Sequence, residues 1–254
     1  MFLKRFLVAL ALAASFTSIT PAAQADEQLN RPAIEAIVKD YLMQHPEVIT
    51  DAINAMQAKQ AADEAERQKK TLADNQDSII NAPQNAVLGN PKGDVTLVEF
   101  FDYNCGYCKR GLADMLKLLQ TDKNLKVVLR DYPILTPGSI EAADVALAVK
   151  NQIQGDKFLQ FHQELLSSRG AVGKDRALEV AQSAGVDMSK LQADMSDPGL
   201  RKSLASNLQL GETLGINGTP SYVIGSELVP GAVGYDALKQ KIDSMRKCGQ
   251  TVCS

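Results

Sequence analysis

Residues 94–110 read DVTLVEFFDYNCGYCKR, and this stretch decides which fold we expect. Its first nine residues form a β-branched and aromatic run that is typical of a buried strand. Two cysteines follow, and a helix is expected over residues 109–119, with Leu and Met on its inward face. A second strand is expected over residues 126–130. This strand–helix–strand order predicts a right-handed parallel crossover.

Cys105 and Cys108 are the candidate catalytic residues. Two intervening residues let both sulfurs meet across the first helical turn. Cys105 should lie at the helix N-terminus, where free N–H groups and the helix dipole favour a reactive, exposed thiolate. Cys108 should be buried and protonated until it resolves a mixed disulfide. A static disulfide and half of a zinc site are the alternatives, but zinc needs four ligands. We therefore predict a redox pair, without a metal or a cofactor.

Glu99 is a further candidate within the otherwise apolar strand. Alternation places it on the face of Val95, Leu97 and Phe101. Burial there should raise the pKa of its carboxyl group and make it a proton acceptor for Cys108. The alternative is a carboxylate at a strand edge that faces water.

The rest of the chain alternates between long helical and short strand segments. Residues 139–214 are mainly helical, strands are expected over 221–224 and 227–229, and a final helix over 235–246. Residues 30–82 are expected to be helical, with Asn30 as a cap and an interruption at Pro46. The apolar stripes of this segment end near residue 56. The stripes form either a seam for self-association, which a charged helical spacer joins to the body, or a surface that packs on the body.

The N-terminus has the pattern of a secretory signal peptide. Lys4 and Arg5 precede an apolar run over residues 6–16, and Ala23-Gln24-Ala25 supplies a small-x-small cleavage site. A membrane anchor is the alternative, but a spanning helix needs about 20 apolar residues. We expect cleavage after Ala25 and export to an oxidising compartment, best matched by a periplasm.

Charge and composition exclude other classes of function. The 254 residues carry a formal net charge of −3 and include two histidines. A net-acidic chain without a dense basic cluster is a poor nucleic-acid binder, and two histidines leave little room for a histidine-rich metal centre. His162 is expected to be a packing or surface residue.

Residues 99–110 resemble the active-site segment of thioredoxin-fold proteins of the DsbA group. The helical interruption and Gly218-Thr219-Pro220 agree with that resemblance, which covers about residues 87–247. The N-terminal helices are similar to those of an oligomeric periplasmic branch that includes the suppressor-of-copper-sensitivity C and Com1-like proteins. The resemblance implies an α/β thioredoxin fold with an inserted helical domain and an N-terminal helical oligomerisation segment.

The resemblance also implies roles for individual residues. It implies a cis bond before Pro220 and a substrate-binding surface formed by Thr219, Pro220, Gly106 and Tyr107. An ordinary turn proline is the alternative. Gly106-Tyr107 departs from the Pro-His pair of the strongly oxidising members, so one source of thiolate stabilisation is missing and the disulfide should be less oxidising.

A second cysteine pair ends the chain. Cys248 and Cys253 are expected to form a structural disulfide that closes a small tail loop. A second redox pair and thiolate coordination of Cu(I) are the alternatives.

These observations predict a signal peptide (1–25), an N-terminal helical segment and linker (26–86), two thioredoxin-fold parts (87–138 and 215–247), a helical insertion (139–214) and a tail (248–254). The expected function is periplasmic dithiol–disulfide exchange in exported proteins, as an isomerase or reductase rather than a net oxidase. The expected partners are cysteine-containing substrates, a membrane redox protein that resets the cysteines, and further copies of the chain, as a dimer or trimer through residues 30–80. A copper-binding or client-holding protein is the alternative.

Overall fold

The computed structural model describes residues 30–82 and 85–253, so the predicted signal peptide lies outside the described residues. The chain divides into two compact units, and the boundary falls within one helix, between Gln57 and Ala58. Among the described residues, no helix is long and apolar enough to cross a membrane.

The first unit holds α1 (Arg31–Gln44) and the beginning of α2 (Glu47–Asp74). The Asn30 side chain accepts a hydrogen bond from the Ala33 amide at 2.9 Å, and α1 ends at His45, before Pro46. No residue of α1 is buried, although its apolar side chains recur at helical spacing. The exposed apolar residues of this unit are Ile34, Ile37, Val38, Tyr41, Met43, Ile49, Ile53 and Met56.

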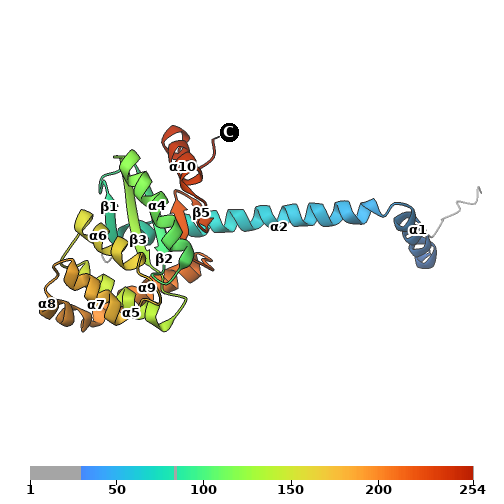
Figure 1. Cartoon of the computed structure of the whole chain (residues 1–254). Coiled ribbons are helices and arrows are strands. Elements are labelled where there is room, and N and C mark those ends of the chain that lie inside the picture. The colour runs from blue at the N-terminus through green and yellow to red at the C-terminus, as the bar shows by residue number, and fades with distance from the viewer. Residues whose placement is uncertain (1–29, 83–84, 254) are drawn as a thin grey trace, which may run out of the picture. The chain divides into compact units, whose positions relative to one another are not determined.

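The second unit is built on a five-stranded sheet with the order β1-β3-β2-β4-β5 (Figure 1). The strands are β1 (Ala86–Gly89), β2 (Val95–Phe101), β3 (Leu125–Asp131), β4 (Ser221–Ile224) and β5 (Glu227–Pro230). β2 and β3 are parallel, as the crossover predicts, and every other neighbouring pair is antiparallel. The α/β thioredoxin fold expected from the sequence is confirmed by this sheet and its helices.

Side-chain alternation in β2 divides the core into two layers. Leu97 and Phe101 pack with α4 (Gly106–Thr121), α6 (Gly155–Leu166) and α10 (Tyr235–Cys248). Val98 and Phe100 pack on the other side, against α3 (Gln76–Asn81) and α9 (Pro198–Thr213). Three further helices complete the helical insertion: α5 (Pro137–Val149), α7 (Lys174–Ser183) and α8 (Met188–Met195). Both α7 and α8 contact α5.

Two boundaries differ from the sequence expectation. Leu72 and Ile79 are buried against the sheet, so the end of α2 and α3 group with the second unit and the compact body begins before residue 87. Residues 86–89, for which the sequence analysis gave no strand, form the edge strand β1, with Ala86 opposite Leu129. The adjacent Gly89, Asn90 and Pro91 concealed this short strand, because those residue types mark turns.

Candidate active site

Cys105 is the N-cap residue of α4, directly after the buried strand β2. Its Sγ accepts a hydrogen bond from the Cys108 amide at 3.3 Å and donates one to the Thr219 carbonyl oxygen at 3.0 Å. The pKa of Cys105 is lowered to about 5, first by the hydrogen bond from the Cys108 side chain and further by the backbone N–H groups of Cys108 and Tyr107, against an opposing effect of burial. The site can therefore hold a thiolate at neutral pH.

The expectation that Cys105 is exposed is wrong, since the residue is only 4% exposed. Its sulfur lies against the carbonyl oxygen of Thr219. Thr219 belongs to a distant loop, and residues 99–110 alone do not indicate that this loop lies beside Cys105. The two residues that follow Cys105 are nevertheless open: Gly106 is exposed with no neighbour near its Cα hydrogens, and Tyr107 is 59% exposed. The open surface next to Cys105 is therefore the one formed by Gly106 and Tyr107.

Cys108 lies one turn into α4 and is completely buried. Burial raises the pKa of its thiol, and the hydrogen bond to Cys105 and the charge on Glu99 raise it further. Both cysteines are free thiols in this structure. The two sulfurs of one short motif thus differ strongly in acidity.

Glu99 is 2% exposed, in the middle of β2 and directly opposite Tyr222 of β4. Burial raises the pKa of its carboxyl group to about 8, and the negative charge on Cys105 adds to that shift. The pKa of Tyr222 is also raised, first by burial and then by the charges on Glu99 and Cys108. The water-facing alternative for Glu99 is therefore wrong: the carboxyl belongs to a buried cluster with Cys108 and Tyr222.

The loop before β4 faces this cluster. The Thr219–Pro220 peptide bond is cis, and the Thr219 hydroxyl is buried without a hydrogen-bond partner among the described residues. The Pro220 carbonyl accepts a hydrogen bond from the Gly231 amide at 2.8 Å. On α4, a Cβ at Gly111 would lie 2.9 Å from the Tyr222 hydroxyl, so glycine permits the close approach of α4 to β4.

Two polar residues hold the cysteine turn in place and were missed in the sequence analysis. Asp102 is buried, and its carboxylate accepts hydrogen bonds from the amides of Asn104, Ile134 and Leu135 at 2.8, 3.0 and 3.0 Å. The Asn104 side chain donates to the Val172 carbonyl at 2.8 Å and accepts from its amide at 2.7 Å. The sequence signal was available, because Asp and Asn just before a helix commonly make such local hydrogen bonds.

His162 is a packing residue, in agreement with the sequence interpretation. It is buried, and its Nδ1 lies 3.2 Å from the Tyr103 hydroxyl. Burial lowers its pKa to about 3, so it is neutral at physiological pH.

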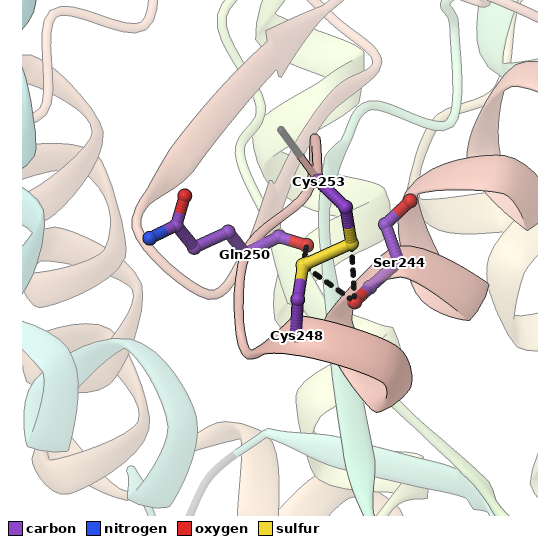
Figure 2. The surroundings of a disulfide bond; sticks show 4 residues. All are labelled: Ser244, Cys248, Gln250 and Cys253. Atoms are coloured by element: carbon purple, nitrogen blue, oxygen red, sulfur yellow. Dashed lines mark hydrogen bonds between the residues drawn. A yellow bond between two sulfur atoms is a disulfide. The ribbon is translucent and has the colours of Figure 1, made fainter.

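The second cysteine pair lies at the C-terminal end of α10, the last helix. Cys248 and Cys253 are joined by a disulfide, and Figure 2 shows the Ser244 carbonyl oxygen facing both sulfurs, at 3.3 and 3.6 Å. Cys248 ends α10, and Gly249 follows in the left-handed conformation (φ 74°). Because carbonyl groups are unpaired at a helix C-terminus, this setting disfavours a thiolate. Among the described residues, no group of three or more His, Cys, Asp or Glu residues could hold a metal ion.

The chain matches two known families. Residues 96–243 match the DSBA-like thioredoxin domain, and residues 31–63 match the copper resistance protein ScsC N-terminal domain. The chain spans about a quarter of the length of the first curated relatives it matches, Na(+)/H(+) antiporters such as NhaA 1 of Salinispora arenicola, at 23% identity over 65% of this chain and 25% of the antiporter.

Solved structures similar to this chain include the following three, each of which covers about 70% of it. A thioredoxin-like oxidoreductase from Silicibacter pomeroyi is 43% identical, covering 68% of this chain and 99% of its own, with a TM-score of 0.64. The catalytic domain of Proteus mirabilis ScsC is 30% identical, covering 69% and 97%, with a TM-score of 0.64. The thiol-disulfide exchange protein alpha-DsbA2 from Wolbachia pipientis is 29% identical, covering 72% and 97%, with a TM-score of 0.66.

Proposed function

The chain belongs to the DSBA-like thioredoxin domain family of thiol–disulfide oxidoreductases, and we propose that it exchanges disulfides in exported proteins as an isomerase or reductase. The observation that carries this proposal is the Cys105 sulfur at the N-terminus of α4, with a pKa lowered to about 5 beside a protonated, buried Cys108. An acidic nucleophile next to a neutral resolving thiol is the arrangement that dithiol exchange requires.

In the proposed reaction, the Cys105 thiolate attacks one sulfur of a substrate disulfide. The substrate S–S bond breaks as the new S–S bond forms, and the leaving substrate thiolate takes a proton from solvent. Cys108 then loses its proton and attacks the Cys105 sulfur, which releases the second substrate thiolate. The second substrate thiolate takes a proton from solvent, so the substrate is fully reduced and the enzyme dithiol is oxidised. A membrane redox partner then returns two electrons, and one proton is taken up at Cys108, which restores the Cys105 thiolate. In isomerisation, a substrate thiolate attacks the mixed disulfide instead, and no net electrons are exchanged.

We assign to Glu99 the role of accepting the proton that Cys108 loses. While Cys105 is a thiolate, its charge helps to raise the pKa of Glu99 to about 8. That charge disappears when Cys105 enters a mixed disulfide, so Glu99 becomes more acidic and more fully ionised. The carboxylate therefore becomes available at the step in which Cys108 must be deprotonated.

The rim of the site suits an unfolded, apolar client. Tyr107, Ile134 and Leu135 are large apolar residues that remain exposed. Ile134 and Leu135 are tied through Asp102 to the cysteine turn, so they have fixed positions near Cys105. We assign substrate binding to Gly106 and Tyr107, which are exposed, and to the half-buried Thr219 and the buried Pro220 of the facing loop.

The preference for isomerisation rests on two features. The residues between the cysteines are Gly106 and Tyr107, so no histidine stabilises the thiolate further. In addition, the apolar stripe of α1 is exposed among the described residues, and the residues that carry it match an ScsC N-terminal domain. We assign this stripe to self-association as a dimer or trimer, which would direct several active sites at one client.

The experiment is refolding of a scrambled protein with several disulfides. Deletion of residues 31–57 removes the first unit and leaves the buried Leu72 anchor in place. Shuffling should be lost while oxidation of a simple dithiol peptide persists. A matched control changes Glu35 and Lys39 on α1 to Gln and should keep both activities. Unchanged shuffling by the deletion variant would refute the role of self-association.

Export to the periplasm completes the proposal. It rests on the predicted cleavage after Ala25 and on a bonded Cys248–Cys253 pair, because disulfides persist in oxidising compartments. Cell fractionation of the full chain, with N-terminal sequencing of the mature protein, tests both the compartment and the cleavage position.

A copper-binding function is the second candidate, supported by the similarity of residues 31–63 to the copper resistance protein ScsC N-terminal domain. In that function Cys105 and Cys108 would hold Cu(I), since soft thiolates prefer this ion. Stoichiometric Cu(I) retention by the reduced protein, together with thiol exchange no faster than that of a Cys105→Ser variant, would favour it over catalysis.

A further inference from the structure

Arg130 is a buried cation on the face of the sheet opposite the cysteines. It lies in β3, is 2% exposed, and its guanidinium carbon is 5.7 Å from the centroid of the Phe100 ring. The Asn85 amide is its hydrogen-bond partner. With the amide oxygen turned toward the guanidinium, it accepts from Nε at 3.1 Å and Nη2 at 3.2 Å.

The remaining nitrogen of Arg130 is unsatisfied. Nη1 is buried and has no hydrogen-bond partner in residues 30–82 and 85–253, and Arg130 forms no ion pair within that part of the chain. Burial lowers the pKa of Arg130 to about 10, and no neighbouring carboxylate offsets that effect. A buried charge without an opposite charge is costly, so this arrangement is unusual unless something else supplies the anion.

Arg130 borders a cavity of about 460 Å³ between α3 and α9. This volume is within the range of small-molecule sites. The other polar residues that line the cavity are mainly neutral amides and hydroxyls. They are Asn75, Asp77, Ser78, Asn81, Ser206, Gln209 and Thr213. Asp77 is the one acidic residue among these, and it already accepts a hydrogen bond from the Asn81 side chain at 2.9 Å.

We propose that this cavity binds a small organic monocarboxylate, whose oxygens accept hydrogen bonds from the unpaired Nη1 of Arg130 and from the surrounding amides and hydroxyls. A guanidinium and a carboxylate match in shape and charge. A single negative charge neutralises Arg130, whereas the second charge of phosphate would face Asp77. The ligand would contact α3 and α9 together, far along the chain from each other and on the sheet face away from Cys105.

The test is a titration of the full-length protein followed by ¹⁵N NMR of the Arg130 Nε–H and the Asn85 side-chain amide. The probes are sodium acetate, sodium propionate and inorganic phosphate, at an ionic strength held constant with sodium chloride. Saturable shifts with acetate or propionate are expected, with an affinity at least tenfold weaker in Arg130→Met and unchanged in Arg201→Gln. Arg201 is an arginine of α9 that does not line this cavity.

A second variant keeps the test decisive if Arg130→Met fails to fold. Ser206→Phe adds bulk to the cavity lining without changing Arg130, and it should also weaken carboxylate binding at least tenfold. The proposal is overturned by shifts that do not saturate, by phosphate binding more tightly than the carboxylates, or by binding that survives in both Arg130→Met and Ser206→Phe.

Discussion

Replacing Cys108 by alanine should raise the pKa of Cys105. The hydrogen bond from the Cys108 side chain is the largest cause of the low Cys105 pKa of about 5. A hydrogen bond to a charged group contributes about 1.5–3 kcal/mol, and one pKa unit corresponds to about 1.4 kcal/mol. The midpoint of Cys105 ionisation should therefore rise by about 1–2 units, to about 6–7. Cys108→Ser keeps a donor at the same position and should stay near the wild-type midpoint.

The assay is the pH dependence of Cys105 alkylation, and the midpoint is more informative than the rate at one pH. At pH 7 a thiol of pKa about 5 is almost fully ionised, whereas an ordinary thiol of pKa about 8.5 is about 3% ionised. The more acidic thiolate is, however, intrinsically less nucleophilic by about 25- to 60-fold over that difference in pKa. The two effects nearly cancel, so a normal rate at pH 7 would not distinguish the two cases.

The variants isolate Cys105 because Cys248 and Cys253 are bonded to each other and Cys108 is absent. A Cys105→Ser control accounts for background modification. A wild-type midpoint near 8.5 would refute the thiolate on which the proposed function depends. Equal midpoints for Cys108→Ala and Cys108→Ser would refute the hydrogen bond as its main cause.

Three further changes test other parts of the site and fold. In reduced Glu99→Gln, resolution of a mixed disulfide should slow by about 100-fold or more in single-turnover experiments, since a positioned base is removed. The wild-type pKa of Glu99 is raised to about 8, so folding opposes its ionisation and the contribution of Glu99 to stability falls as pH rises from about 4 to 8. In urea unfolding, the stability difference between Glu99→Gln and the wild type should shift in favour of the variant over that range, and a difference that does not change with pH would contradict the burial argument. Gly111→Ala forces a Cβ to within 2.9 Å of the Tyr222 hydroxyl and should cost about 1–3 kcal/mol in urea unfolding, whereas Gly106→Ala meets open space and should show no such clash. Deletion of residues 31–57 should convert a dimer or trimer to a monomer in sedimentation experiments, and an unchanged mass would place the interface elsewhere.

The fold was largely predictable from local patterns. The strand before Cys105 is a long run of β-branched and aromatic residues, and the helix after Cys108 has a clear apolar face, so both elements follow from periodicity. The burial of Glu99 also followed from alternation within its strand. These signals are strong because each element is several residues longer than the shortest pattern that could arise by chance.

The missed features depend on contacts between distant segments. The burial of Cys105 requires Thr219, more than 100 residues later, to lie against its sulfur. Asp102 and Asn104 hold the cysteine turn only through hydrogen bonds with distant residues, Asp102 with the Leu135 amide and Asn104 with the Val172 amide. No periodic pattern encodes such pairings, because they depend on how the helical insertion returns to the sheet.

The two cysteine pairs show how position in a helix selects chemistry. Cys105 begins α4, where its sulfur accepts a hydrogen bond from the Cys108 amide and also donates one to the Thr219 carbonyl oxygen. Cys248 ends α10, where the hydrogen-bond partners of its sulfur among the described residues are the carbonyl oxygens of Ser244 and Gln250. Amide hydrogens stabilise a thiolate and carbonyl oxygens destabilise one. The helix ends therefore favour exchange at the first pair and a lasting bond at the second.

In the proposed exchange reaction, the electrostatic interactions within the buried cluster set the order of the deprotonation steps. A thiolate at Cys105 raises the pKa of Glu99 and of Cys108, so neither loses its proton while the nucleophile is free. Attack on a substrate consumes that charge, and both groups become easier to ionise. Deprotonation of Cys108 therefore becomes easier once a mixed disulfide exists, and the Glu99 carboxylate is then available to accept the proton. Losing that carboxylate should slow resolution and lengthen the interval in which a client can shuffle its own cysteines. A Glu99→Gln enzyme that resolves mixed disulfides at the wild-type rate would show that another group accepts the Cys108 proton.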